Sequence, residues 1–227
     1  MTSYPLVDFL FDNRSHPLRS QMAAWLAASP RFATFVEEYK NKIRKKIRVL
    51  NGEEMALDLL AELETAYLLL ADRRFELFYE PYVGEKKRGP DFTASWRTNL
   101  TFNLEVTRLR SGSGEVEGRL ADVVCEKLGQ MQPAMINLLA VVGSDQVPAP
   151  DLATAMQHLK LLAEKRDPIL YARQGYQTPA DFFKGYERLS GILWRHGAES
   201  PVDYWHNPQA RRLLPKKVRN LLVVLSS

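Results

Sequence analysis

The chain has 227 residues, 45% hydrophobic and 26% charged, so disorder is not the default expectation. The formal net charge of +4 permits a polyanionic partner without requiring one. The single cysteine, Cys125, excludes an internal disulfide and a multi-cysteine zinc site. No run reaches the roughly 18 apolar residues of a membrane span, and the N-terminus lacks a secretory-signal pattern, so we predict a cytoplasmic protein with no membrane partner.

The first third of the chain predicts helices. The segments with helical spacing of apolar residues are 22–29, 31–50 and 53–72. Pro30 ends the first, and Asn51-Gly52 separates the other two. The third segment is apolar around most of its circumference, which indicates packing on more than one side. If that helix were exposed on several sides, a homodimer would be favoured.

After Arg74 the hydrophobic period changes to that of strands. We expect strands at 75–83, 91–97, 100–109, 134–143 and 189–195, and helices at 116–131, 151–166 and 178–189. Short connections between the first three strands favour an antiparallel meander. Residues 207–225 read as helical or mixed around Pro215.

This order of elements predicts one α+β domain, in which helices flank a mixed sheet of about four to five strands. We place an N-terminal helical extension at residues 1–50. The α/β core, with its C-terminal helical or mixed elaboration, takes residues 51–227.

Two carboxylates lie in or beside adjacent predicted strands. Asp91 follows a proline at the start of one strand, and Glu105 lies inside the next. Strand alternation directs Glu105 and Thr107 to one face and Val106 and Arg108 to the other. Two carboxylates and the carbonyl of Val106 are ligands of the type that Mg²⁺ or Mn²⁺ takes. The competing interpretations are a turn aspartate and an isolated strand charge.

A third carboxylate is available on the apolar helix that precedes these strands. Glu62 and Glu64 both lie there, where an ionised side chain needs compensation. Two residues apart, they point in different directions, so only one can face the strands. We expect it to be Glu62.

A helix glutamate, a Pro-Asp pair and a glutamate on the next strand, as in ELETAYLLL, PDF and NLEVTRL, resemble the PD-(D/E)xK nuclease superfamily of restriction enzymes and Holliday-junction resolvases. The resemblance covers roughly residues 53–143. It implies a layered α/β/α core and metal-dependent hydrolysis of nucleic-acid phosphodiesters, with DNA favoured over RNA. Asp91 and Glu105 would be Mg²⁺ or Mn²⁺ ligands, and Glu62 a supporting ligand or a water-positioning residue. LSGILWRHG and YWHNPQARRLLP look like C-terminal segments of bacterial proteins predicted to carry this core.

The sequence departs from that superfamily at one position. Its lysine falls at position 107, where this chain has Thr107, which carries no charge to stabilise the transition state. The superfamily is known to relocate the lysine to a neighbouring helix, and Lys127 and Arg119 are the candidates here. Arg108 is near in sequence but faces the other side of the strand.

Basic residues supply candidate phosphate contacts. Lys86, Lys87 and Arg88 precede Asp91, and Arg108 follows Glu105. A second basic segment, residues 40–48, is interpreted as a solvated helix face balanced by nearby glutamates. Two alternatives to a nuclease stay open. One is a catalytically degenerate protein of this fold that binds nucleic acid or a protein partner, and the other is an unrelated enzyme or scaffold.

Overall fold

The computed structural model describes residues 4–81, 89–144, 146–196 and 200–225. Its centre is a mixed six-stranded sheet in the order β1-β2-β3-β4-β5-β6. The strands are β1 (Phe75–Tyr79), β2 (Phe92–Trp96), β3 (Leu100–Leu109), β4 (Ile136–Gly143), β5 (Leu189–His196) and β6 (Asp203–His206). The first three strands are antiparallel neighbours, β3, β4 and β5 are parallel, and β6 is antiparallel to β5.

Four helices precede the sheet: α1 (Tyr4–Phe11), α2 (Arg19–Ala28), α3 (Pro30–Val49) and α4 (Glu53–Ala71). Ser29 caps α3 by accepting a hydrogen bond from the backbone N–H of Phe32, and a proline occupies the first turn. The apolar stripe of α3 is buried. Arg31, near the start of α3, donates to the carbonyls of Leu70 and Asp72 at the end of α4, at 2.7 and 2.6 Å. Both helices are therefore joined where one starts and the other ends.

The remaining helices follow the third strand: α5 (Val116–Leu128), α6 (Leu152–Glu164), α7 (Pro168–Gln174), α8 (Pro179–Tyr186) and α9 (Lys216–Val224). Three of these helices begin with a side-chain cap. Asp151 and Asp167 accept backbone N–H groups at the first turns of α6 and α7, and Thr178 forms a capping box with Asp181 at α8.

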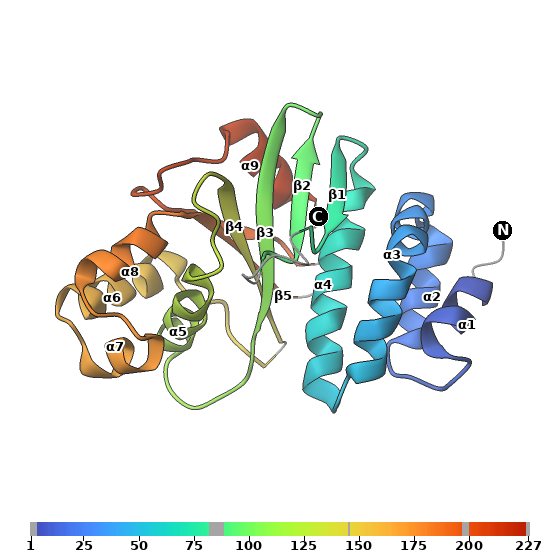
Figure 1. Ribbon diagram of the computed structural model, residues 1–227, viewed down its shortest axis with the longest axis horizontal. Helices are drawn as coiled ribbons and strands as arrows, with labels where there is room; N and C mark the ends of the chain where they lie inside the picture. The colour runs from blue at the N-terminus through green and yellow to red at the C-terminus, as the bar shows by residue number, and fades with distance from the viewer. Residues whose placement is uncertain (1–3, 82–88, 145, 197–199, 226–227) are drawn as a thin grey trace.

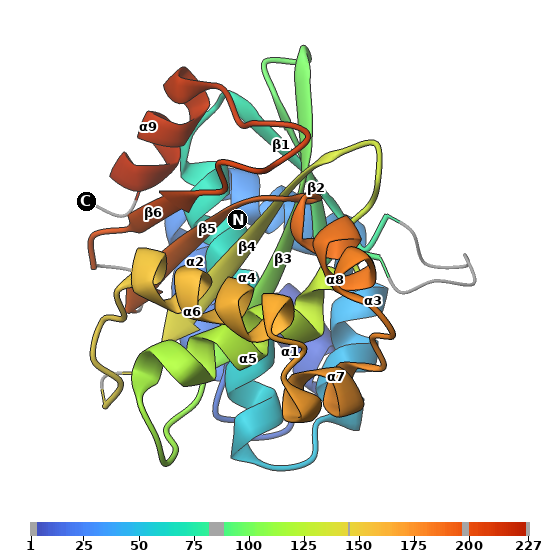
Figure 2. The same cartoon turned by 90° about the vertical axis from the view of Figure 1, so that its left-hand side faces the viewer.

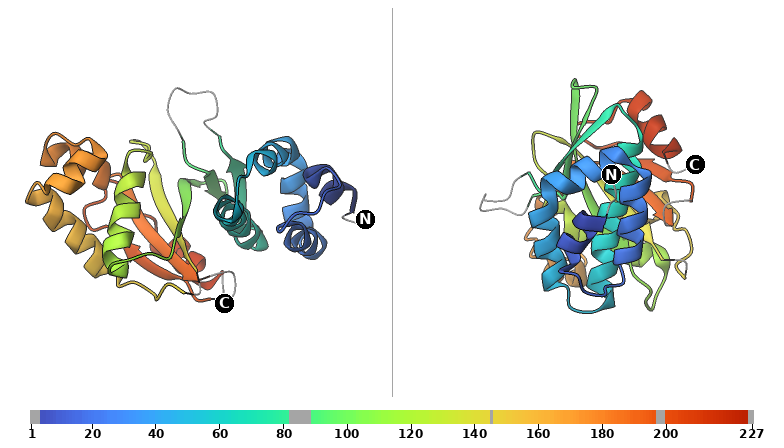
Figure 3. Two further views of the ribbon diagram at one scale, coloured as in Figure 1. Left: turned by 90° about the horizontal axis from the view of Figure 1, so that it is seen from below. Right: turned by 90° about the vertical axis from the view of Figure 1, so that its right-hand side faces the viewer.

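Helices cover both faces of the sheet (Figure 1). On one face α4 packs directly, with α1–α3 beyond it, and these helices, α9 and the sheet share one hydrophobic cluster. On the other face α5, α6 and α8 form a second cluster with Leu109 of β3 and with buried residues of β4 and β5. Figure 2 shows this second helical layer in front of the sheet, and Figure 3 shows the layers edge-on.

The expected mixed sheet flanked by helices is confirmed, but the expected strand number of four to five was wrong. The additional strand is β6, which has only four residues, too few for alternation to be visible in the sequence. Helices α1 and α7 were also not expected, because seven or eight residues hold barely two helical turns. In the part of the chain described, no helix is long and apolar enough to cross a membrane.

Unequal strand lengths open the sheet beside β3. The β2–β3 pairing ends where Phe92 faces Leu104, whereas β3 continues to Leu109. From Glu105 onward, β3 therefore extends past the start of β2 and has no register partner in β2. This is the part of the sheet where the predicted site residues lie.

Candidate functional site

Asp91 is fixed against the edge of β3 at the point where β2 begins. Its Oδ2 accepts a hydrogen bond from the backbone N–H of Val106 at 2.8 Å. Its own carbonyl accepts from the backbone N–H of Glu80 at 2.7 Å. The carboxylate thus takes the place that a strand residue would occupy in the ladder. Strand geometry directs the carbonyl of Val106 to the same edge as its N–H, toward Asp91.

Glu105 is a buried carboxylate on the face of β3 that packs against α5. Its side chain is 3% exposed, and Oε1 lies 2.7 Å from Nζ of Lys127. Its Oε2 is buried and has no hydrogen-bond partner within the described part of the chain. Leaving a buried charged oxygen unsatisfied costs more free energy than an ordinary hydrogen bond contributes. An oxygen of this kind is a candidate ligand for an ion or an ordered water.

Glu62 approaches from α4. Its Oε2 accepts a hydrogen bond from the hydroxyl of Tyr79 at 2.8 Å and another from Nζ of Lys46 at 2.6 Å. Lys46 also lies 2.9 Å from Oε1 of Glu80. Two cations, Lys46 and Lys127, therefore compensate the acidic side chains from opposite sides.

The electrostatics of the site centre on Asp91. Desolvation raises its pKa well above the usual aspartate value, and the nearby charges of Glu62 and Glu105 raise it further. The Val106 N–H and the Lys46 ammonium act in the opposite direction but do not prevail. Burial lowers the pKa of Lys46, yet the charges of Glu62 and Glu80 outweigh it and raise that pKa overall. The ionised form of Asp91 is therefore disfavoured while no cation is bound beside it.

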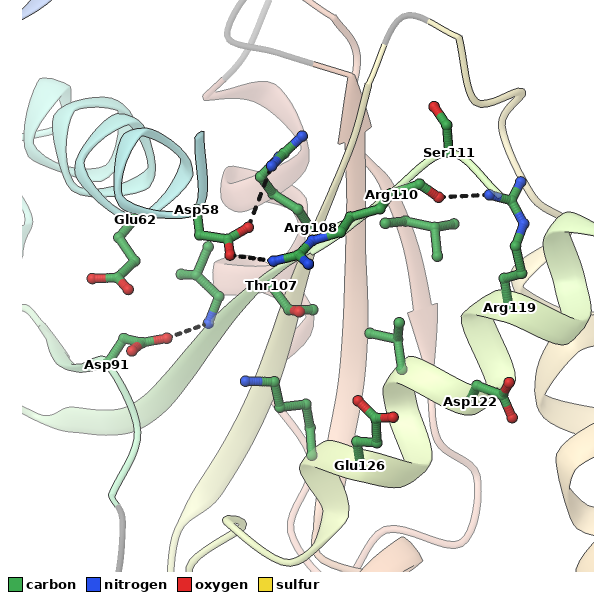
Figure 4. Close-up of a pocket in the computed structure, with 14 residues that line it drawn as sticks. Asp58, Glu62, Asp91, Thr107, Arg108, Arg110, Ser111, Arg119, Asp122 and Glu126 are labelled. Atoms are coloured by element: carbon green, nitrogen blue, oxygen red, sulfur yellow. Dashed lines mark hydrogen bonds and ion pairs between the residues drawn. The ribbon is translucent and has the colours of Figure 1, made fainter. Parts of the chain in front are cut away.

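A cleft of about 530 Å³ opens over β3 between α4 and α5. Its lining includes Asp58 and Glu62 from α4, Asp91, Thr107 from β3, and Arg119 and Lys127 from α5. Figure 4 shows the side chains of Glu62 and Asp91 close together at one end and Arg119 at the other, while the guanidinium of Arg110 lies beside Asp58. The carboxylates therefore face a space large enough for a substrate group.

No protein-family model, curated protein or solved structure matches this chain. The chemistry of the cleft must therefore be inferred from its own residues.

Most of the predicted site residues come together here. Asp91, the backbone of Val106, Glu62 and Lys127 line the cleft, and Glu105 lies directly beneath Lys127. Glu64, the alternative to Glu62, points away and pairs with Arg195 on β5. Its separation from Glu62 is what a spacing of two residues on a helix requires.

The structure describes only some of the residues predicted to contact nucleic acid. Lys86, Lys87 and Arg88 lie outside the described residues. Arg108 faces α4, where its guanidinium binds Glu54 and Asp58 at 3.1 and 3.4 Å. Its charge is thus compensated within the chain. Arg119 lies at the far end of the cleft and donates to the carbonyl of Arg110 at 2.6 Å, away from Glu105.

Lys46 and Tyr79 were not expected in the site. The basic segment 40–48 is only in part the solvated face that its charges suggest: Lys40 pairs with Glu37 on the same helix, but four of its six cations bind other parts of the chain. Lys42 donates to the carbonyls of Tyr79 and Glu80, Lys46 binds Glu62 and Glu80, and Arg44 and Arg48 bind Asp12. A signal existed in the sequence: Lys46 lies three residues after Ile43 and directly before Ile47, at the border of the buried stripe.

Whether these residues suit a divalent cation can be judged from their donor atoms. Among the residues that the structure describes, no three His, Cys, Asp or Glu side chains form a group that could hold a metal ion. What remains is a two-carboxylate arrangement: Asp91, the unsatisfied Oε2 of Glu105, and the carbonyl of Val106. Mg²⁺ is commonly bound by one or two carboxylates, with water and substrate phosphate as its other ligands. In donor type, though not as a group of three side chains, these residues are of the kind that Mg²⁺ takes.

Proposed function

We propose that this protein is a divalent-metal-dependent nuclease that hydrolyses phosphodiesters of nucleic acid in the cleft beside β3. The observation that carries the proposal is the buried carboxylate of Glu105, whose Oε2 lacks a partner while Lys127 holds Oε1. Buried charges in proteins are paired or bind metals. The cation on Oε1 and the buried, unpartnered Oε2 therefore support a site completed by an ion.

The chain's own residues take the following roles in this proposal. Asp91, Glu105 and the carbonyl of Val106 hold Mg²⁺ or Mn²⁺, which supplies Lewis-acid activation of water and charge neutralisation when bound. Lys127 supplies the positive charge that Thr107 lacks, from the helix beside the cleft. Glu62 supports the ion or orients the attacking water. Hydrogen bonds to the neighbouring Tyr79 and Lys46 restrict Glu62 to one orientation.

Nucleic acid is the proposed substrate class, with DNA before RNA. The order α4-β1-β2-β3-α5-β4 and the carboxylates at the open edge of β3 support the likeness to PD-(D/E)xK nucleases. We also propose that the protein is cytoplasmic and forms a homodimer.

A second candidate is a protein of this fold that binds nucleic acid or a protein partner without cleavage. It is favoured by Thr107 at the lysine position and by the pairing of Lys127 with Glu105, which already neutralises one of the two carboxylates without a metal. In that case Lys127 is a permanent counterion rather than a catalytic cation.

Calorimetric titration of Mn²⁺ into the wild type and Asp91→Ala, with and without duplex DNA, tests the proposal. We expect binding to the wild type that Asp91→Ala abolishes, and Mn²⁺-dependent nicking of supercoiled plasmid DNA by the wild type only. Glu64→Gln is the matched control, because Glu64 lies on α4 but points away from the cleft. Mn²⁺ binding without cleavage of DNA or RNA would favour the second candidate. Absence of binding to the wild type in both conditions would contradict the metal site.

A further inference from the structure

Lys46 reaches the site from a helix outside the core expected from the sequence. It belongs to α3, within the segment 1–50, whereas Glu62 lies on α4 and Tyr79 on β1. The views in Figures 1 and 3 both place α3 beside α4. The three side chains meet at a single atom, Oε2 of Glu62.

This convergence commits Oε2 of Glu62, while Oε1 has no hydrogen-bond partner among the described residues. Oε2 accepts from both the Lys46 ammonium and the Tyr79 hydroxyl, while Glu62 lines the cleft with its carboxylate toward Asp91. Lys46 lies over the ring of Tyr79, 4.8 Å from its centroid, and Tyr79 is 1% exposed. The two donors therefore support each other as well as the carboxylate.

A neighbouring lysine shows what a purely structural contact of α3 looks like. Lys42, one turn before Lys46, donates to the backbone carbonyls of Tyr79 and Glu80 at 2.9 and 3.3 Å. Among the described residues it joins α3 to the end of β1 and makes no contact with Glu62. Lys46 instead ends on two carboxylates, one of which faces the cleft.

We propose that Lys46 is a positioning residue for the site: its ammonium, together with the Tyr79 hydroxyl, fixes the carboxylate of Glu62 toward Asp91. This inference rests on the proposed function, because it assigns Glu62 a role in metal support or water orientation. It also makes the N-terminal helices part of the site rather than an extension. Partners that orient metal-site groups commonly contribute about 10- to 100-fold in affinity or activity.

The test uses the full chain and four variants. Lys46→Met removes the ammonium but keeps the length of the side chain, and Lys46→Arg keeps the charge. Lys42→Met is the matched control on the same helix, and Asp91→Asn is the benchmark for loss of the metal site. Each protein is titrated with Mn²⁺ by calorimetry in the presence of duplex DNA, and kcat and KM are measured on the same duplex.

We expect Lys46→Met to weaken Mn²⁺ binding or lower kcat by about tenfold or more, with KM for the duplex unchanged, and Lys46→Arg to recover most of the loss. Lys42→Met should match the wild type in both readouts. Equal losses in Lys42→Met and Lys46→Met would overturn the inference, because both lysines would then act only by holding α3. Metal binding that Asp91→Asn abolishes, together with Mn²⁺ affinity and kcat that are both unchanged in Lys46→Met, would overturn this inference alone. Absence of Mn²⁺ binding to the wild type overturns the proposed function and this inference together.

Discussion

Nζ of Lys127 lies 2.7 Å from Oε1 of Glu105, so that α5 supplies a cation to a carboxylate that is almost inaccessible from solvent. Lys127 lines the cleft while Glu105 lies behind it. The ammonium is therefore the group that an incoming phosphate would meet, in the part of the site where Thr107 offers only a hydroxyl.

Lys127→Met should abolish or strongly reduce cleavage without weakening Mn²⁺ binding. We expect a loss of about 100-fold or more in kcat, the usual effect of removing one group that stabilises transition-state charge. Mn²⁺ affinity should not fall, since the ion loses no ligand and no longer competes with a neighbouring positive charge. Plasmid nicking and calorimetry on the same preparation measure both, and Lys127→Arg is the charge-preserving control. Activity equal to that of the wild type would refute the role of Lys127.

Asp91→Asn should make the metal-free protein more stable at alkaline pH. Desolvation and the charges of Glu62 and Glu105 raise the pKa of Asp91 above its value in the unfolded chain. The stability that this carboxyl contributes is therefore present below the unfolded pKa and is lost as pH rises through the folded pKa. An amide keeps the acceptor for the Val106 N–H without the charge.

Urea unfolding in the presence of EDTA at about pH 5 and about pH 8 measures this effect. Relative to the wild type, the free energy of unfolding of Asp91→Asn should be higher at about pH 8 than at about pH 5. Added Mn²⁺ should stabilise the wild type alone, because only its native state binds the ion. A difference that does not change with pH would show that Asp91 has the same pKa in the folded and unfolded chain.

Glu62 and Glu64 should behave in opposite ways when each is replaced by glutamine. Glu64 pairs with Arg195, whose side chain is 7% exposed and also donates to Thr65 at 3.1 Å. Removing one partner of a largely buried pair leaves the other charge uncompensated, so Glu64→Gln should lower the free energy of unfolding by roughly 2–3 kcal/mol. Cleavage per folded molecule should be unchanged. Glu62→Gln should lower cleavage with a smaller effect on stability, and the reverse pattern would contradict the assignment of Glu62 to the site.

Asp12→Asn should remove stability that the wild type has at neutral pH and loses in acid. Hydrogen bonds from Arg48 and then Arg44 hold the pKa of Asp12 well below its usual value. Such a group stabilises the fold above its unfolded pKa, and the contribution is lost as pH falls through the folded pKa. Asparagine tolerates the positive φ of 53° at this position, so backbone strain is not a confounding change.

The comparison for Asp12 is a pair of urea-unfolding series from about pH 7 down to about pH 3. The free energy of unfolding of the wild type should exceed that of Asp12→Asn at neutral pH, and the two values should converge in acid. If the difference in free energy of unfolding between the two proteins stays constant across the series, the arginines do not lower the pKa of Asp12 in the folded chain.

Long amphipathic segments made most of the fold predictable. The period of α3, α4 and α5 and the strand runs of β1–β4 are long enough for burial on one face to leave a pattern. β6 left none, because its residues are half-buried or exposed and its pairing with β5 depends on a neighbour distant in sequence. The separation of Glu62 from Glu64 followed from helix geometry alone.

The partners of the carboxylates were harder to predict. Lys127 was a candidate because it lies on the helix after β3, but Lys46 was assigned to a solvated face. The charges of residues 40–48 look balanced by glutamates close in sequence, whereas the structure pairs four of them with partners on other elements. Ion pairs between distant elements depend on packing, which a charge pattern does not contain.

The attachment of α3 at both ends changes what counts as the smallest working unit of this protein. Arg31 closes the end of α4 through the carbonyls of Leu70 and Asp72, and Lys46 binds Glu62 farther back along the same helix. A shortened chain that begins at residue 51 would leave those carbonyls uncapped and Glu62 without its cation. Expression and crystallisation of the cleft therefore require α3, and dividing the chain at residue 50 would cut through the support of the site itself.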